Sequence, residues 1–156
     1  MADTYTQIYL QLVFAVQGRI PLIQDHIRDE LEKYICGIIK AHKAKVYAIY
    51  CNPDHIHILV SANPRLSVSE LVKLIKSNSA KWLNEKREIR EKFRWQYGYG
   101  AFSYAHNSLD NVIHYIENQE EHHKVFTFKE EYELLLKEFK INYQERNLFS
   151  FDVDEN

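Results

Sequence analysis

Two short apolar runs separated by only three residues constrain the fold of this chain most strongly. Residues 45–51 and 55–60 are rich in β-branched and aromatic types, and Asn52-Pro53-Asp54 between them is a turn sequence. So short a connection joins antiparallel strands, because a parallel pair needs a crossover of a dozen or more residues. The sequence therefore predicts an antiparallel hairpin in the middle of the chain.

The segments around this hairpin predict a larger sheet with two helices. Residues 5–16 have the composition of a strand, and residues 22–41 carry an apolar stripe at helical spacing. A second helix over residues 67–85 opens with a capping box, and residues 101–105 predict a fourth strand. This order is that of an α+β ferredoxin-like sandwich, a four-stranded antiparallel sheet with both helices on one face. The first and third strands would be central.

The third predicted strand carries two histidines. Side chains alternate along a strand, so His55 and His57 share one face, while Ile56 and Ile58 face the helices. The histidines would then point to the open face of the sheet. Two imidazoles there could ligate one divalent metal, or they could be ordinary strand histidines without a ligand.

A further helix is predicted over residues 109–122. At about 100° per residue, one polar stripe of this helix holds Asn111, Tyr115, Gln119 and His122. If the helix lies against the open sheet face, Gln119 adds a carbonyl oxygen to the imidazoles, a donor set suited to Mg²⁺ or Mn²⁺. Tyr115 could then attack a phosphodiester polarised by the metal and conserve the bond energy as a phosphotyrosine.

Charge is unevenly distributed, although the net charge is only −2. Residues 73–94 contain eight Lys and Arg against three Glu, whereas residues 117–156 contain eleven acids against five bases. A basic middle region is compatible with local phosphate binding. Lys73, Lys76 and Lys81 are therefore candidates for DNA contact, with an ordinary solvated helix face as the alternative.

The segment after these lysines concentrates aromatic residues and glycines. Arg94, Trp95 and Tyr97 lie within it. Aromatic side chains beside an arginine can stack on unpaired bases. They also commonly form the small core of a loop, so these three residues are DNA-binding candidates only if other features indicate a nucleic acid.

Several classes of protein are disfavoured by what the sequence lacks. No apolar run approaches the ~20 residues of a membrane span, and the N-terminus has no signal-peptide pattern. Cys36 and Cys51 lack metal-ligand spacing and are more simply buried thiols in a reducing cytoplasm. No nucleotide-binding fingerprint is present. We expect a cytoplasmic protein without a membrane partner.

The combined pattern resembles the single-tyrosine HUH transposases of the TnpA type, which include insertion-sequence 200/605-like and REP-associated tyrosine transposase-like proteins. The matching segments are residues 52–60, 66–77, 95–103 and 114–122, in the family's order. Residues 126–149 are similar to the C-terminal extension of some members. The resemblance therefore covers nearly the whole chain.

This resemblance implies a bacterial DNA transposase that cleaves single-stranded DNA beside hairpins and transfers the strand through a 5′-phosphotyrosine. It implies His55, His57 and Gln119 as ligands of Mg²⁺ or Mn²⁺, and Tyr115 as the nucleophile. It also implies a homodimer in which the tyrosine helix of one subunit can complete the histidine site of the other.

The implied organisation is a single domain over residues 1–156, made of a ferredoxin-like core (1–106), the helix that carries the catalytic tyrosine (107–123) and a C-terminal extension with a helix (124–156). The sequence departs from the family at Gln11 and Gln17, where members often carry a histidine and a lysine.

Other proteins with alternating strand histidines fit less well. Nucleotide hydrolases of this kind carry a third histidine at the position of Leu59. Metallo-β-lactamase-like hydrolases carry an Asp-His pair at the position of Ile58-Leu59. A plasmid-type HUH nickase usually places its tyrosine differently relative to the histidines. The remaining alternative is a non-catalytic or host-adapted protein that binds nucleic-acid hairpins on the same fold.

Overall fold

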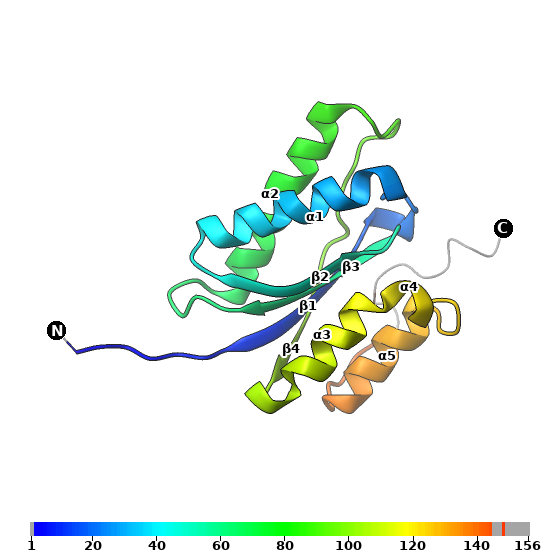
Figure 1. The fold of residues 1–156 in the computed structure, drawn as a ribbon. Coiled ribbons are helices and arrows are strands. Elements are labelled where there is room, and N and C mark those ends of the chain that lie inside the picture. The colour runs from blue at the N-terminus through cyan, green and yellow to red at the C-terminus, as the bar shows by residue number, and fades with distance from the viewer. Residues whose placement is uncertain (1, 145–147, 149–156) are drawn as a thin grey trace.

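A four-stranded antiparallel sheet forms the middle layer of the molecule (Figure 1). The computed structural model describes residues 2–144 and residue 148. The strand order is β2-β3-β1-β4, and the strands are β1 (Tyr9–Ala15), β2 (Lys45–Cys51), β3 (His55–Ser61) and β4 (Gly100–Tyr104). The predicted hairpin and the central positions of the first and third strands are confirmed.

Helices cover both faces of this sheet (Figure 1). The first face carries α1 (Asp25–Ala41) and α2 (Val68–Lys86), and the second face carries α3 (Leu109–Glu117), the short α4 (Gln119–His122) and α5 (Phe128–Glu138). Two 3₁₀ turns, η1 (Gln17–Arg19) and η2 (His106–Ser108), follow β1 and β4. The ferredoxin-like sandwich is confirmed, with α3 and α5 added on the face opposite its two helices.

Alternation along the two central strands divides the core. Leu12, Phe14, Ile56 and Ile58 are fully buried on the side of α1 and α2. On the other side, Leu59 packs with apolar residues of α3. Both faces of β1 and β3 are buried, which explains why β1 is apolar except at Gln11 and why His55 and His57 of β3 are themselves buried.

Two elements begin later than the sequence predicts. β1 starts at Tyr9 because its neighbour β3 ends at Ser61, the residue paired with Tyr9. α1 starts at Asp25 because the backbone N–H of Ile23 donates to the carbonyl of Pro53, 3.0 Å away, instead of entering the helix.

The predicted helix over residues 109–122 is broken at Asn118. This residue has φ −102° and ψ 23°, and its side-chain amide donates to the carbonyl of His114 at 2.7 Å. Such a local bond competes with helix continuation. The chain is therefore divided into two helices at Asn118, although His122 still lies beside Tyr115, with their ring centroids 5.1 Å apart.

The C-terminal helix is confirmed as α5. Its start is fixed by a capping box, in which the Thr127 hydroxyl accepts from the Glu130 N–H and the Glu130 carboxylate accepts from the Thr127 N–H. Residues 145–147 and 149–156 of the predicted extension lie outside the described residues. Within the described part of the chain, every helix is too short or too polar to cross a membrane.

Gly100 stands where β4 approaches α5. A Cβ at this position would lie 2.8 Å from the hydroxyl of Tyr132 and 2.8 Å from a ring carbon of Phe102, and both rings are buried. We expect Gly100→Ala to lower the free energy of unfolding by about 1–3 kcal/mol, measured by urea denaturation. Gly37→Ala in α1 is the control, because no atom lies within 4 Å of its added Cβ. This control should gain about 0.5–1 kcal/mol, and equal losses in both variants would contradict the packing argument.

Candidate active site

The two strand histidines lie side by side beneath the helices of the second sheet face. The rings of His55 and His57 are 5.3 Å apart between centroids, and the two residues are 2% and 0% exposed. They share the face that the alternation predicts, but this face is not open. Because α3, α4 and α5 cover it, the imidazoles lie in a buried site where charges interact more strongly than in water.

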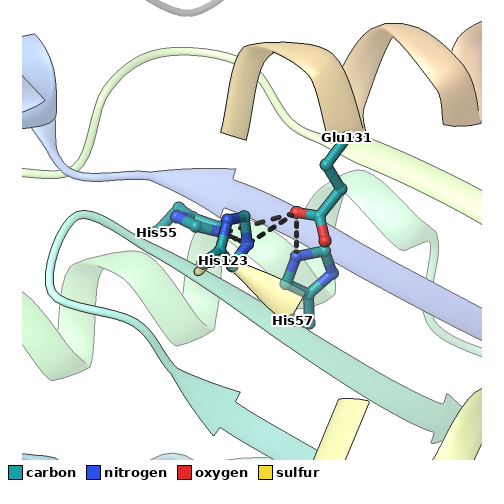
Figure 2. Close-up of side chains that lie close together, drawn as sticks. All are labelled: His55, His57, His123 and Glu131. Carbon is teal, nitrogen blue, oxygen red and sulfur yellow. Dashed lines mark hydrogen bonds and ion pairs between the residues drawn. The ribbon is translucent and has the colours of Figure 1, made fainter. Parts of the chain in front are cut away.

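A carboxylate from α5 stands at the centre of this site. Figure 2 shows the side chains of His55, His57, His123 and Glu131 converging. Oε1 of Glu131 lies 2.8 Å from Nε2 of His57, 3.2 Å from Nε2 of His123 and 3.5 Å from Nε2 of His55. One ligand atom from each of the four residues lies within 4.8 Å of all the others. We call these four residues the histidine–glutamate cluster.

Tyr115 and Gln119 join the cluster through the second oxygen of Glu131. The Tyr115 hydroxyl donates to Oε2 of Glu131, and its ring lies 5.9 Å from that of His57 between centroids. Gln119 is fully buried; its Nε2 donates to Oε2 of Glu131 at 3.0 Å, and its Oε1 accepts from Asn52 at 3.1 Å. The structure therefore brings all four predicted active-site residues together within one chain.

Asp54 and Arg19 orient the first histidine. Nδ1 of His55 lies 2.7 Å from Oδ1 of Asp54, whose other oxygen accepts from Nε of Arg19 at 3.2 Å. Burial alone would raise the pKa of Asp54, but His55 and Arg19 lower it below its usual value. The ionised carboxylate accepts a hydrogen bond from Nδ1–H of His55 and leaves Nε2 directed at the cluster, as in many metal-ligating histidines.

Gln11, one of the two departures from the resembled family, supports the second histidine. Its side-chain nitrogen lies 2.8 Å from Nδ1 of His57, and its oxygen accepts from the Tyr104 hydroxyl at 2.8 Å. Gln11 is 1% exposed. A glutamine at this position therefore fixes the ring of His57 by a chain of hydrogen bonds that runs back to β4.

The cluster strongly shifts the acidity of its members. Burial alone would raise the pKa of Glu131, but His57 and the other imidazoles hold it well below its usual range. Burial, reinforced by the charge of Glu131, raises the pKa of Tyr115 above its usual value. Burial lowers the pKa of His57, which favours the neutral imidazole that ligates metals. The site thus combines an ionised carboxylate, a neutral imidazole and a protonated tyrosine.

This donor set fits a divalent metal. Three imidazole nitrogens and a carboxylate oxygen converge within the reach of one ion. Imidazole nitrogens suit transition metals such as Mn²⁺ and Zn²⁺ better than Mg²⁺, which prefers oxygen ligands. The cluster can therefore hold a divalent metal ion.

Sequence reasoning missed Glu131 and His123. In the case of Glu131 a signal was present, since it lies on the stripe of α5 that also buries Phe128, Tyr132 and Leu135. A glutamate on an apolar stripe is rarely buried unless it is paired. No comparable signal marks His123, which lies outside the polar stripe predicted on residues 109–122.

Most of the predicted DNA-binding residues line one groove on the other side of the molecule. The groove measures about 620 Å³ and lies between α2 and residues 92–99. Its lining includes Lys73, Lys76, Arg94, Trp95 and Tyr97, whereas Lys81 is not part of it. We call this surface the α2 groove. Tyr97 is 98% exposed, so its ring is available to stack on a ligand.

Two residues of the α2 groove also have structural contacts. The Lys76 ammonium donates to the carbonyls of Gln96 at 2.8 Å and Gly98 at 2.6 Å, and burial lowers its pKa to about 8. Nε1 of Trp95 donates to the Ser79 hydroxyl at 2.9 Å. These two side chains shape the groove, whereas Lys73, Arg94 and Tyr97 are exposed along it.

Two sequence comparisons find relatives of this chain. The profile of the family described as "Transposase IS200 like" matches residues 4–119. The ISDra2 transposase TnpA of Deinococcus radiodurans is 25% identical over 118 residues, which cover 72% of this chain and 84% of that protein.

Two solved structures share the fold. A crystal structure from Deinococcus radiodurans R1, described as that of a transposase, superposes with a TM-score of 0.60 at 22% identity, covering 76% of this chain and 96% of that one. A REP-associated tyrosine transposase bound to a REP hairpin superposes with a TM-score of 0.58 at 14% identity, covering 79% of this chain and 73% of that one.

The family match contains both strand histidines, Tyr115 and Gln119, whereas His123 and Glu131 lie beyond its last residue. Because the match extends over most of the sequence, the chain belongs to the IS200-like transposase family.

Proposed function

We propose that this transposase cuts single-stranded DNA beside a hairpin and joins it covalently to Tyr115. One observation carries the proposal: the Tyr115 hydroxyl and the Nε2 atoms of His55 and His57 meet on the two oxygens of Glu131. Phosphodiester transfer needs a nucleophile next to a set of metal ligands. Here both contact the side chain of Glu131.

His55, His57, His123 and Glu131 would hold the metal, with the carbonyl oxygen of Gln119, 3.0 Å from Nε2 of His123, as a further donor. A bound Mg²⁺ or Mn²⁺ supplies charge stabilisation to the non-bridging oxygens of the scissile phosphate. The three imidazoles favour Mn²⁺ of the two. Asp54 and Gln11 keep the histidine rings oriented throughout the reaction.

Tyr115 carries the covalent step. Its oxygen forms a bond to phosphorus while the bond to the 3′-oxygen breaks, which leaves a 5′-phosphotyrosine and a 3′-hydroxyl. The tyrosine proton passes to Oε2 of Glu131, the acceptor that it already contacts, and the leaving 3′-oxygen takes a proton from solvent water. Attack by a 3′-hydroxyl on the phosphotyrosine reverses the step and joins strands without a nucleotide cofactor.

The substrate would be single-stranded DNA that carries hairpins, in the bacterial cytoplasm. Support comes from the α2 groove, whose cations and exposed Tyr97 suit a phosphate backbone and unpaired bases. The homodimer implied by the sequence resemblance remains part of this proposal, although Tyr115 lies beside the histidines of its own chain.

Formation of a covalent adduct tests the proposal directly. Purified protein is incubated with single-stranded hairpin DNA and Mn²⁺ or Mg²⁺, then separated on a denaturing gel. We expect a protein–DNA band that requires the metal and disappears with EDTA. Tight hairpin binding without an adduct in the presence of either metal would instead support a second candidate function, hairpin binding without cleavage.

That second candidate is a hairpin-binding protein that does not cut DNA. It is favoured by the contact between the Tyr115 hydroxyl and the buried carboxylate of Glu131, which keeps the tyrosine protonated. In this case the α2 groove would still bind nucleic acid, but the cluster would only stabilise the packing of α5.

The α2 groove gives a separate prediction about affinity. We expect Lys73→Ala to weaken hairpin DNA binding about three- to tenfold at low salt and to reduce its salt dependence, because one phosphate contact is lost. Lys81→Ala is the matched control, an exposed lysine of the same helix outside the groove. Fluorescence anisotropy at several salt concentrations measures both. If Lys81→Ala weakens binding more than Lys73→Ala, the DNA does not follow this groove.

A further inference from the structure

A cavity of about 580 Å³ opens beside Tyr115, between α3, β4 and α5. Tyr115 and Glu131 form part of its lining, so it is continuous with the histidine–glutamate cluster. Its volume falls in the range of about 300–1,000 Å³ that is usual for small-molecule sites. The cavity is therefore large enough for a nucleotide. A nucleotide whose phosphate is attacked by Tyr115 lies close to the cavity, because Tyr115 is part of its lining.

Polar side chains without partners surround the cavity. Ser103, Asn111 and Glu138 line it and are exposed. Among the described residues, none makes a hydrogen bond or ion pair with their side chains. These groups can therefore bind a ligand without first breaking an interaction within the protein.

The charge of the lining favours binding of a nucleotide base over binding of a phosphate. Two carboxylates, Glu131 and Glu138, line the cavity, and no described lining residue is a lysine or arginine. Carboxylates repel phosphate but accept hydrogen bonds from the exocyclic amine of a base, as they do from cytosine in DNA grooves. The rings of Tyr104 and Phe139, 5.4 Å apart between centroids, give the cavity an aromatic wall.

We propose that this cavity holds the base of the nucleotide on the 3′ side of the cut and prefers a base with an exocyclic amine over thymine. The inference rests on the proposed cleavage chemistry. In an in-line displacement the leaving 3′-oxygen lies opposite the attacking tyrosine oxygen. The nucleotide on the 3′ side keeps its bond to phosphorus, so its base can occupy the space on the tyrosine's side, where the cavity lies.

The preference is tested with hairpin oligonucleotides in which each nucleotide of the single-stranded flank is changed in turn to dA, dC, dG, dT or an abasic residue. Adduct formation by the wild-type protein maps the cut and gives the rate for each base. At the nucleotide 3′ to the cut we expect thymine and the abasic residue to react about tenfold more slowly, the effect of one hydrogen bond to a charged group.

Two variants assign this preference to the cavity. Glu138→Ala should reduce the tenfold difference to twofold or less, whereas Glu133→Ala, on the same helix outside the lining, should retain it. Adduct formation with no base preference, or a preference that survives Glu138→Ala, overturns the inference and leaves the cleavage chemistry standing.

Absence of any adduct would contradict the cleavage proposal instead, and equilibrium binding then tests the cavity. The affinity of Tyr115→Phe protein for the same oligonucleotides is measured by anisotropy, with and without Glu138→Ala. A base preference that depends on Glu138 supports the cavity as a base site, and equal affinities for all five oligonucleotides at every position overturn it.

Discussion

Tyr115→Phe is expected to abolish the covalent protein–DNA adduct while leaving hairpin binding within about twofold of wild type. The change removes only the hydroxyl, which is the attacking group, and loss of a nucleophile reduces turnover by many orders of magnitude. The ring keeps its packing against His57 and His122. Oε2 of Glu131 keeps its bond from Gln119, so the fold should be retained.

The measurement is a denaturing gel with 3′-labelled hairpin DNA, because the 5′-phosphotyrosine retains the 3′ fragment. Tyr34→Phe is a suitable control, since Tyr34 stacks on Trp82 on the opposite side of the sheet. It should form the adduct at the wild-type rate. An adduct that persists in Tyr115→Phe shows that another residue is the nucleophile.

His57→Ala is expected to reduce cleavage at least about 100-fold, with a much smaller effect on hairpin affinity. The loss follows from the removal of a metal ligand, and even the supporting residues of metal sites contribute about 10–100-fold. The α2 groove, where we place the DNA backbone, lies away from this side chain. Rates of adduct formation and anisotropy titrations give the two quantities separately.

Thermal unfolding with Mn²⁺ gives a second measure of the same variant. A metal at 100 times its dissociation constant stabilises the protein that binds it by about 2.7 kcal/mol. We expect Mn²⁺ to raise the melting temperature of the wild type and of His26→Ala, an exposed histidine of α1, but not of His57→Ala. Equal losses of cleavage and hairpin binding in His57→Ala would mean that the histidines only support the fold.

The fold was predictable because its elements carry their own patterns. Alternation in β3 separated His55 and His57 from the core residues, and the three-residue turn before it required an antiparallel partner. The polar stripe on residues 109–122 correctly placed Tyr115 and Gln119 on the sheet side of their helices. These are local regularities, and a single sequence displays them directly.

The rest of the site depends on contacts between segments far apart in the chain. Glu131 meets His57 across 74 residues, and its position follows from how α5 docks rather than from any spacing near the histidines. The turn at Asn118 depends on one side-chain bond that competes with an otherwise helical sequence. Periodicity correctly placed His122 beside Tyr115, where its Nε2 lies 3.1 Å from Oε2 of Glu131, but it gave no role to His123.

The position of Glu131 in the chain has a consequence during synthesis. The strands of the sheet end at Tyr104, and a growing chain can assemble local units before its later segments exist. Until α5 has left the ribosome, the three imidazoles lack their carboxylate and the Tyr115 hydroxyl lacks its acceptor. A nascent transposase close to its own gene therefore cannot have a complete site until translation has passed residue 131.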